Sequence, residues 1–347
     1  MLGKVMTNSA LTAKVHAMSG HLLTADDYDV MMGFKRIYQI SDYLTENPTY
    51  SDVLKGTRGR DIHRTELEQI LHYNLEYDVK RLLPFMQRGA KKFIEVIGLE
   101  GTISKIKLCL RLIRMGHPKQ VFEYKDDFTD FKLPSEINSV DDFIQGLEGT
   151  LCYEPLKIFL NRPELQDTFE METALDSFWA DYMLKASDKY LSPDERKPIR
   201  KVFGTEFDLS NLSFLIRCKR TFDMTDAEIY SSIIPRYYRL TEATVSKIIK
   251  SPSYDAAIEI IAEETPYKAA FSAEDRFIEK RLTEYITRIK KHCYNANAYS
   301  ILSPLCYIHL RRNEINNIVS IIEGIRYKLD PDTIKDYLIG YEKGGDK

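Results

Sequence analysis

A glycine-rich basic segment, Gly56-Thr-Arg-Gly59-Arg60, is the part of the chain closest in type to a phosphate-binding loop. A P-loop cradles phosphates with backbone N–H groups, and needs a second glycine five positions after the first, followed directly by Lys and Ser or Thr. Here neither the spacing nor the Lys-Ser/Thr pair is present. The segment predicts a solvated loop ahead of a long helix, and the functional alternative is a basic contact with a partner.

Nucleophilic and hydrolytic chemistry has little support in the sequence. Ser104 and Lys107 have the Ser-x-x-Lys spacing, but the motifs that accompany it in acyl-transfer enzymes are absent. The chain contains no HExxH and no GxSxG. No histidine follows a glutamate by three positions, which argues against a carboxylate-bundle enzyme with Glu-x-x-His ligands. We expect a protein without a catalytic centre.

The candidate metal ligands are dispersed. His16 and His21 lie five positions apart, so on a helix they point to different faces. The acidic pairs 26–27 and 141–142 suit the first turn of a helix, where the helix dipole favours negative charge. The five cysteines never form a CxxC pair and predict reduced, packed thiols: Cys109, Cys152, Cys218, Cys293 and Cys306. We expect no metal and no cofactor.

Composition excludes several classes of protein. The 347 residues carry 49 basic and 52 acidic side chains, and a net charge of −3 gives no global attraction to nucleic acid or to an anionic membrane. The most apolar stretch, Ile301 to Leu310, is interrupted by Pro304 and is too short to cross a bilayer. The N-terminus lacks the apolar centre of a signal peptide. Membrane association would therefore have to go through a protein partner or a surface contact.

Helical periodicity dominates the chain. Apolar residues recur at steps of three and four from Leu67 to Ile97, which is typical of a long amphipathic helix, and Pro84 should kink or split it. Further long helices are predicted over about 170–190 and 273–294. Hairpin signals are nearly absent and glycine is scarce. The predicted fold class is all-α.

Three segments align without gaps at a spacing of 106 residues: TISKIKLCLRLIRMGHP from Thr102, DLSNLSFLIRCKRTFDM from Asp208 and EINNIVSIIEGIRYKLD from Glu314. Apolar residues coincide at three positions of the alignment. Arginine coincides as well, at Arg114, Arg220 and Arg326. A second helix start follows the arginine, most clearly in the capping-box spacing of Thr225 and Glu228 and in Asp330-Pro331.

A second repeated unit ends in a tyrosine, at Tyr50, Tyr153 and Tyr267. Proline just before the first and third of these favours a helix break there. The order of the units predicts an internal triplication, with helical repeats at 1–124, 125–231 and 232–347 forming three quasi-equivalent bundle lobes. The alternative is a chance similarity among amphipathic helices, for which apolar matches at helical spacing are common.

Two stretches resemble the C subunit of the archaeal and bacterial V/A-type ATPases, which is the counterpart of the d subunit of eukaryotic V-ATPases. One is AKVHAMSGHLLTADDYDVMMGFKRIYQISDYLTENPTY near the N-terminus. The other is YIHLRRNEINNIVSIIEGIRYKLDPDTIKDYLI, where Glu314, Asn317, Ile318 and Ile322 match the family's closing helix. The resemblance extends over the full length and is weakest between Phe122 and Asp208.

The resemblance implies a non-catalytic, funnel- or socket-shaped protein of the central stalk of a rotary ATPase. Such a protein holds the axle, which consists of the D and F subunits, and sits on the cytoplasmic loops of the membrane proteolipid ring. It transmits torque for ion transport or ATP synthesis, binds no nucleotide or nucleic acid, and is a monomer when isolated. A helical scaffold or adaptor in an unrelated complex is the alternative that the repeats alone leave open.

The repeated residues have two interpretations. The structural one is that each arginine anchors its helix to a neighbouring turn, and that each tyrosine is a buried turn anchor. The functional one is that some of them line a central cavity and contact the axle. Glu314 and Asn317 flank the apolar stripe of their helix, and we expect Asn317 to contribute to helix packing. The full set of candidates is Arg114, Arg220, Arg326, Tyr50, Tyr153, Tyr267, Glu314 and Asn317.

Overall fold

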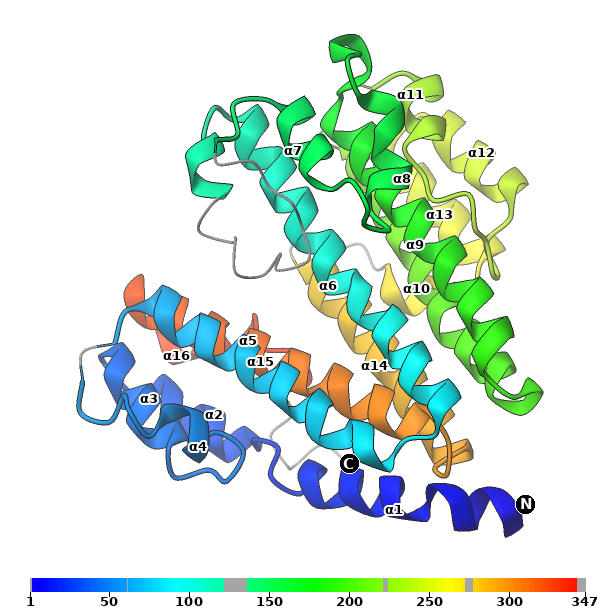
Figure 1. The fold of residues 1–347 in the computed structure, drawn as a ribbon. Helices are drawn as coiled ribbons and strands as arrows, with labels where there is room; N and C mark the ends of the chain where they lie inside the picture. The colour runs from blue at the N-terminus through cyan, green and yellow to red at the C-terminus, as the bar shows by residue number, and fades with distance from the viewer. Residues whose placement is uncertain (1, 61, 122–135, 221–223, 272–276, 342–347) are drawn as a thin grey trace. The chain divides into compact units, whose positions relative to one another are not determined.

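The structure, a computed structural model, describes residues 2–60, 62–121, 136–220, 224–271 and 277–341. Over these ranges the only regular elements are α-helices and short 3-10 helices, so the predicted all-α class is confirmed (Figure 1). The chain divides into two compact units. Unit 1 combines both ends of the chain, Met1–Gln87 and Lys268–Lys347, and unit 2 is Arg88–Tyr267. The threefold division of the sequence stays a prediction.

Unit 1 is built around the long helix α15, against which α5, α14 and α1 lie. Figure 1 shows α5 alongside α15. The elements of unit 1 are α1 Leu2–Ser19, α2 Ala25–Met32, α3 Ile37–Leu44, α4 Ser51–Leu54, α5 Arg64–Leu82, η1 Leu83–Phe85, η5 Lys268–Ala270, α14 Ile278–Ala296, α15 Leu302–Arg326 and α16 Pro331–Lys335.

The core of unit 1 joins residues from the two ends of the chain. Apolar side chains of α15, including Ile315, Ile318 and Ile322, are fully buried against the short helices of the N-terminal segment. Met31 and Ile40 are among the side chains that cover them. The N-terminal segment therefore packs on the predicted apolar stripe of α15, although almost the whole chain separates the two in sequence.

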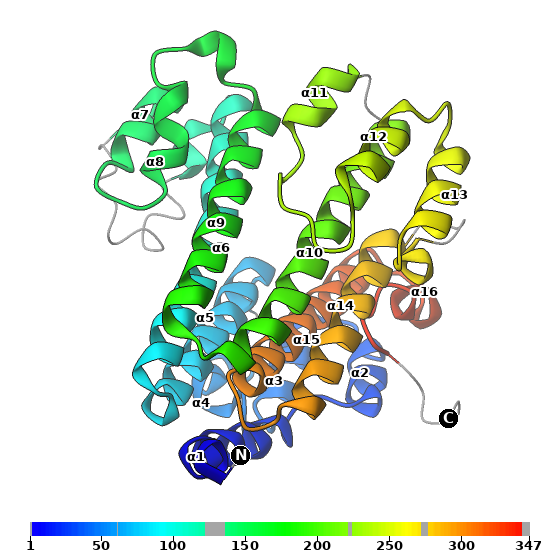
Figure 2. The same cartoon turned by 90° about the vertical axis from the view of Figure 1, so that its right-hand side faces the viewer.

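Unit 2 contains two long antiparallel pairs around α9, which lies against both α6 and α10 (Figure 2). Its core includes Trp179, which meets the rings of Phe203 and Phe207 edge-on. The elements of unit 2 are α6 Arg88–Arg114, α7 Val140–Gly146, α8 Tyr153–Leu156, η3 Lys157–Phe159, η4 Pro163–Leu165, α9 Thr168–Tyr190, α10 Pro193–Arg220, α11 Asp226–Ser231, α12 Glu242–Lys250 and α13 Tyr254–Glu264.

Local signals in the sequence correctly place several of the helix ends. The apolar stripe from Leu67 is split at Pro84, which falls within η1 between α5 and α6, as predicted. Thr225 and Glu228 form the expected capping box, and Asp330 caps α16 with Pro331 in its first turn. The pairs 26–27 and 141–142 lie in the first turns of α2 and α7. These elements form where their residues predict because caps and prolines act locally.

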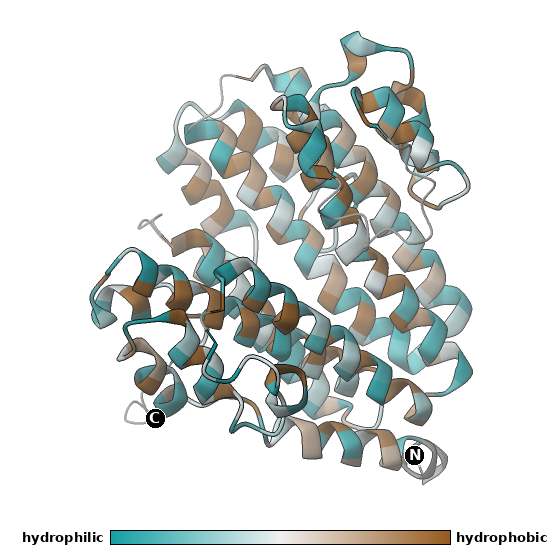
Figure 3. Ribbon diagram, turned by 60° about the vertical axis from the view of Figure 1, so that its left-hand side comes forward, coloured by the Kyte–Doolittle hydropathy of each residue, from teal (hydrophilic) through white to brown (hydrophobic). Residues whose placement is uncertain are grey.

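Polar and apolar residues alternate around the helices of both units, and none of the long helices is apolar all round (Figure 3). Among the described residues, no helix combines the length and the apolar character that a bilayer crossing needs.

Candidate functional site: the buried acid–tyrosine clusters

The three repeated arginines occupy the same place in three helices. Arg114 is the last residue of α6, Arg220 of α10 and Arg326 of α15. The spacing of 106 residues therefore marks the ends of three long helices, where a cation interacts favourably with the helix dipole. All three side chains are exposed. Arg220 lies over the ring of Tyr254 and Arg326 over that of Tyr327, at 5.9 and 5.0 Å from the ring centroids.

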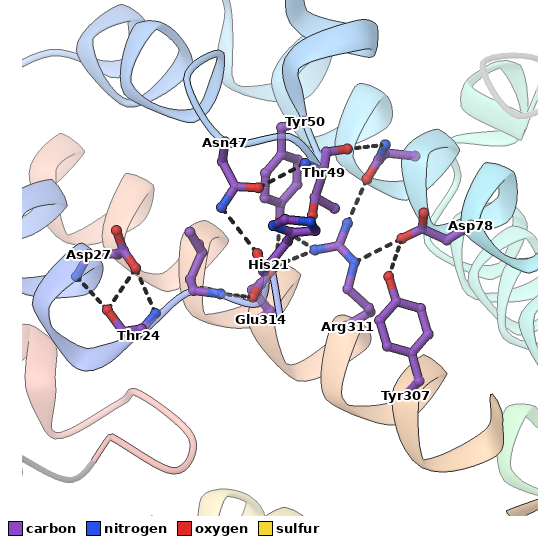
Figure 4. Close-up of polar contacts among 12 residues, drawn as sticks. His21, Thr24, Asp27, Asn47, Thr49, Tyr50, Asp78, Tyr307, Arg311 and Glu314 are labelled. Atoms are coloured by element: carbon purple, nitrogen blue, oxygen red, sulfur yellow. Dashed lines mark hydrogen bonds and ion pairs between the residues drawn. The ribbon is translucent and has the colours of Figure 1, made fainter. Parts of the chain in front are cut away.

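The α15 cluster lies inside unit 1 and consists of Tyr50, Asn74, Asp78, Tyr307, Arg311 and Glu314 (Figure 4). Arg311 is fully buried, and its guanidinium donates to Asp78 at 3.0 Å, to Asn74 at 2.5 Å and to the hydroxyl of Tyr50 at 2.6 Å. It also pairs with Glu314, one helical turn further along α15. One cation thus joins α15 to α5 and to the turn at Tyr50.

Tyr50 links this cation to the acid. Its hydroxyl accepts from Arg311 and donates to Glu314 Oε1 at 2.5 Å, and its ring lies under the guanidinium at 4.6 Å from the centroid. Burial and the charge of Glu314 raise the pKa of Tyr50 well above its usual value. The phenol therefore stays protonated and remains a hydrogen-bond donor over the physiological pH range.

Glu314 also holds the entry to α2. Its second oxygen, Oε2, accepts from the backbone N–H of Leu23 at 2.5 Å, directly before Thr24, the N-cap of α2. Burial raises the pKa of Glu314, while the charge of Arg311 and the hydrogen bonds to the carboxylate oppose that rise. The acid is thus a structural centre: it organises a turn, a helix entry and a guanidinium at one point.

A second cluster, the α10 cluster, repeats this arrangement in unit 2. Asp208 accepts from the hydroxyl of Tyr267 at 2.6 Å. Its carboxylate also accepts from the backbone N–H groups of Tyr238, Arg239 and Leu240 at 2.6–3.0 Å, directly before Thr241, the N-cap of α12. Asp208 is fully buried, and all of its partners carry no charge in these bonds.

The two clusters are related position by position. Asp208 and Glu314 are 106 residues apart, the spacing of the arginine repeat. Tyr50 and Tyr267 are 217 apart, and so are Leu23 and Leu240, whose N–H groups bond to the two acids. An acid, a tyrosine and a helix entry therefore recur in the same arrangement in both units. The repeat inferred from sequence corresponds here to two copies of one hydrogen-bonded arrangement.

Each copy also contains a repeated asparagine. Asn317 donates to the carbonyl of Ile339 at 3.0 Å and accepts from its N–H at 2.7 Å. Asn211, 106 residues earlier, makes the same pair of bonds to Ile234, both at 2.9 Å. An amide side chain that bonds both backbone groups of one residue fixes the path of the chain beyond the helix. Asn317 is buried and packs its helix in this way.

Tyr153, the remaining tyrosine of the predicted set, differs from the other two. Tyr50 and Tyr267 are buried, whereas Tyr153 is partly exposed at the start of α8. Among the described residues, its hydroxyl makes no hydrogen bond, and no acid stands at the corresponding position of α6, which is Thr102. Two of the three tyrosines thus share one environment.

Among the residues of the clusters that were not predicted from the sequence are Asp208, Asn211, Asp78 and Arg311. The first two could have been predicted, because the aligned segments begin DLSN and EINN, with an acid and an asparagine at the same positions. The other two could not have been predicted, because the hydrogen bond from Arg311 to Asp78 joins residues that are 233 positions apart in the sequence. Neither cluster is open to a substrate, since the acids and tyrosines that form them are buried. No group of His, Cys, Asp and Glu side chains within the described ranges is arranged to hold a metal.

The chain is similar to known proteins over almost its whole length. A family model described as the ATP synthase (C/AC39) subunit matches residues 11–337. The chain belongs to this family. Membership of the C/AC39 family favours a component of a rotary ATPase over a scaffold in an unrelated complex.

Individual relatives of the C/AC39 family cover nearly the whole chain. The C subunit of the A-type ATP synthase of Pyrococcus horikoshii is 25% identical over 344 residues, 94% of this chain and 89% of the relative. The protein of the same name from Methanococcoides burtonii is 26% identical and covers 95% and 93% of the two chains. That of Methanobrevibacter smithii is 23% identical and covers 91% and 83%.

Proposed function

We propose that this chain is the non-catalytic central-stalk protein that couples the axle of a rotary ATPase to its membrane ring. The observation that carries the proposal is the family match from residue 11 to residue 337, together with relatives named as the C subunit of A-type ATP synthases that align over most of their length. In this role the chain binds the D and F subunits of the axle on one side and the cytoplasmic loops of the proteolipid ring on the other. It works on the cytoplasmic side of the membrane, as a peripheral component of the complex.

The construction of the two units supports a mechanical role. A coupling protein must transmit force without deforming, and long helices with hydrogen-bonded cores resist deformation because interiors are close-packed and little compressible. Both clusters contribute to such cores, since each ties a long helix to a turn and to the start of another helix. The most polar interior groups are thereby committed to holding the chain together and are unavailable to a substrate.

The exposed repeat positions are the best candidates for partner contacts. The repeated arginines lie at the surface: Arg114, Arg220 and Arg326. The other candidates are buried inside their units and cannot contact a partner: Tyr50, Tyr267, Glu314 and Asn317. We propose that the arginines contribute to the contact with the axle. Arginine is enriched in protein interfaces because its planar guanidinium can bond in several directions and stack on aromatic rings.

Co-purification of the full chain with the D–F axle complex tests the coupling role. We expect a stoichiometric complex, crosslinks that map to one face of the chain, and no ATP hydrolysis by the purified chain alone. Turnover that follows the chain through purification, or failure to bind the axle complex, would refute the proposal.

Charge reversal tests the arginine contacts. Arg326→Glu should weaken axle binding, while Arg58→Glu, which makes the same change at an exposed arginine outside the repeat, should not. Reversal of this charge is expected to weaken binding about tenfold or more, because a like-charge contact costs several kcal/mol and about 1.4 kcal/mol is a tenfold change in affinity. Equal binding by both variants would exclude Arg326 from the interface.

A further inference from the structure

Three long helices carry a docked segment at equivalent positions. On α15 the docked segment runs from Leu23 to Tyr50, and on α10 it runs from Leu240 to Tyr267. In both cases an acid at the repeat position receives the tyrosine hydroxyl and the N–H group that precedes the first docked helix. On α6 the corresponding segment contains α7 and α8, and α7 packs against α6 within unit 2.

The docking position on α6 lacks the polar groups of the other two. Thr102 stands where Asp208 and Glu314 stand, and Lys105 stands where Asn211 and Asn317 stand. A threonine offers no carboxylate to receive a phenol and a backbone N–H together, and a lysine has no acceptor atom for an N–H group. The acid–tyrosine pair and the paired amide are therefore both missing on α6.

Apolar burial holds the segment within unit 2, where α7 packs against α6 and α8 packs against α9. Phe143, Ile144, Leu147 and Leu156 are fully buried. The carboxylate of Asp141 bonds to the N–H of Asn161 and to the side chain of Gln166, which follow the segment in the chain and do not belong to α6. Apolar contacts are non-directional, whereas a buried hydrogen bond from a phenol to an acid is lost outright when the segment moves. Among the described residues, no hydrogen bond from a phenol to an acid joins the segment to α6, so none is lost when the segment moves away from that helix.

We propose that residues 140–156 form the compliant part of unit 2: the segment opens locally from α6 more readily than residues 241–267 open from α10. The same comparison holds inside unit 1, where residues 24–50 are held on α15 by an acid–tyrosine pair. Regions that open locally differ in free energy from the rest of a fold, and a missing buried anchor lowers that free energy. The fold therefore contains two docked segments that are held by an acid–tyrosine pair, and one without such a pair that can open locally when force acts on the chain.

Hydrogen exchange of the full chain, resolved by segment with mass spectrometry, tests this proposal. In the unaltered protein we expect amides of 140–156 to exchange roughly 10-fold to 100-fold faster than the protected amides of 24–50 and 241–267, the factor that one buried hydrogen bond to a charged group represents. This comparison needs no variant. Equal protection of the three segments would overturn the proposal.

A matched set of substitutions provides the second measurement. Tyr50→Phe and Tyr267→Phe each remove only a hydroxyl, and each should accelerate exchange in its own segment about tenfold or more. Tyr153→Phe is the control, because it makes the same change at the tyrosine without an acid partner, and it should leave exchange of 140–156 unchanged. The proposal fails if Tyr153→Phe accelerates exchange as strongly as the other two, or if the other two have no effect.

Discussion

Replacement of Arg311 by methionine should destabilise unit 1 severely. Methionine keeps much of the length of the side chain but removes every donor, so Asp78 and Glu314 lose the cation between them. Both acids are almost entirely buried, at 0% and 3% exposed. Removing one partner of a buried ion pair costs about 3–5 kcal/mol, because the remaining charge is left without compensation.

Protonation of Glu314 limits its share of that cost. A glutamate of ordinary pKa takes up a proton at pH 7 for about 3.7 kcal/mol and at pH 5 for about 1 kcal/mol. Burial already raises the pKa of Glu314, so the protonated form is easier to reach than in water. The penalty of Arg311→Met should therefore shrink as the pH falls from 7 to 5, since a neutral acid needs no cation.

Urea unfolding with two probes measures this effect. Far-UV circular dichroism follows the helices of both units, whereas tryptophan fluorescence follows only Trp179 in unit 2, because the chain has one tryptophan. The dichroism transition should move to lower urea in Arg311→Met. Arg58→Met removes an arginine whose side chain is 70% exposed, and it should change the free energy of unfolding by no more than about 0.5 kcal/mol. A penalty below about 1 kcal/mol at pH 7 would refute the role given to the α15 cluster.

Single positions in the interior and on the surface give the remaining predictions. Burial and the charge of Lys290 lower the pKa of His309 to about 2. The unfolded chain therefore binds a proton near pH 6.5 that the folded chain does not bind. The free energy of unfolding should decrease as the pH falls below about 6.5. Between pH 7 and pH 5 this group should cost about 2 kcal/mol, and His309→Gln should remove that part of the slope; identical slopes in both proteins would contradict the prediction. Gly204→Ala should destabilise unit 2 by about 1–3 kcal/mol, because a Cβ there would lie 2.7 Å from Cβ of Tyr238, whose N–H is held by Asp208. Gly98→Ala, at an exposed position of α6 with no atom near the added Cβ, should instead stabilise by about 0.5–1 kcal/mol, and Trp179 fluorescence during urea unfolding would show the opposite signs.

Much of the helical architecture was predictable because its signals are local. The apolar stripe from Leu67 predicts a helix, and Pro84 divides it, since proline removes a donor and clashes with the preceding turn. The caps at Thr225 and Asp330 act over three residues and lie where the sequence placed them. The arginine register predicted equivalent positions, and the structure shows these positions to be helix ends.

The environment of the repeated tyrosines was only partly predictable. Tyr50 and Tyr267 are buried, and each donates its hydroxyl to an acid. Tyr153 follows the same sequence pattern but remains partly exposed, because the side chain it would bond to is decided by another helix, where Thr102 replaces an acid. A pattern within one segment carries no information about the chemistry of the surface on which that segment docks.

The sequence by itself determined the all-helical class, the caps and breaks, the register of 106 residues and the family. Only the tertiary structure decided which segments meet: that Arg311 of the last long helix is neutralised by Asp78 of α5, and that Glu314 receives the turn at Tyr50. The physical reason is that helix periodicity selects a buried face from neighbouring residues alone. The partner of that face depends on how distant segments pack, and a buried charge can be stable only after that packing has brought its partner to it.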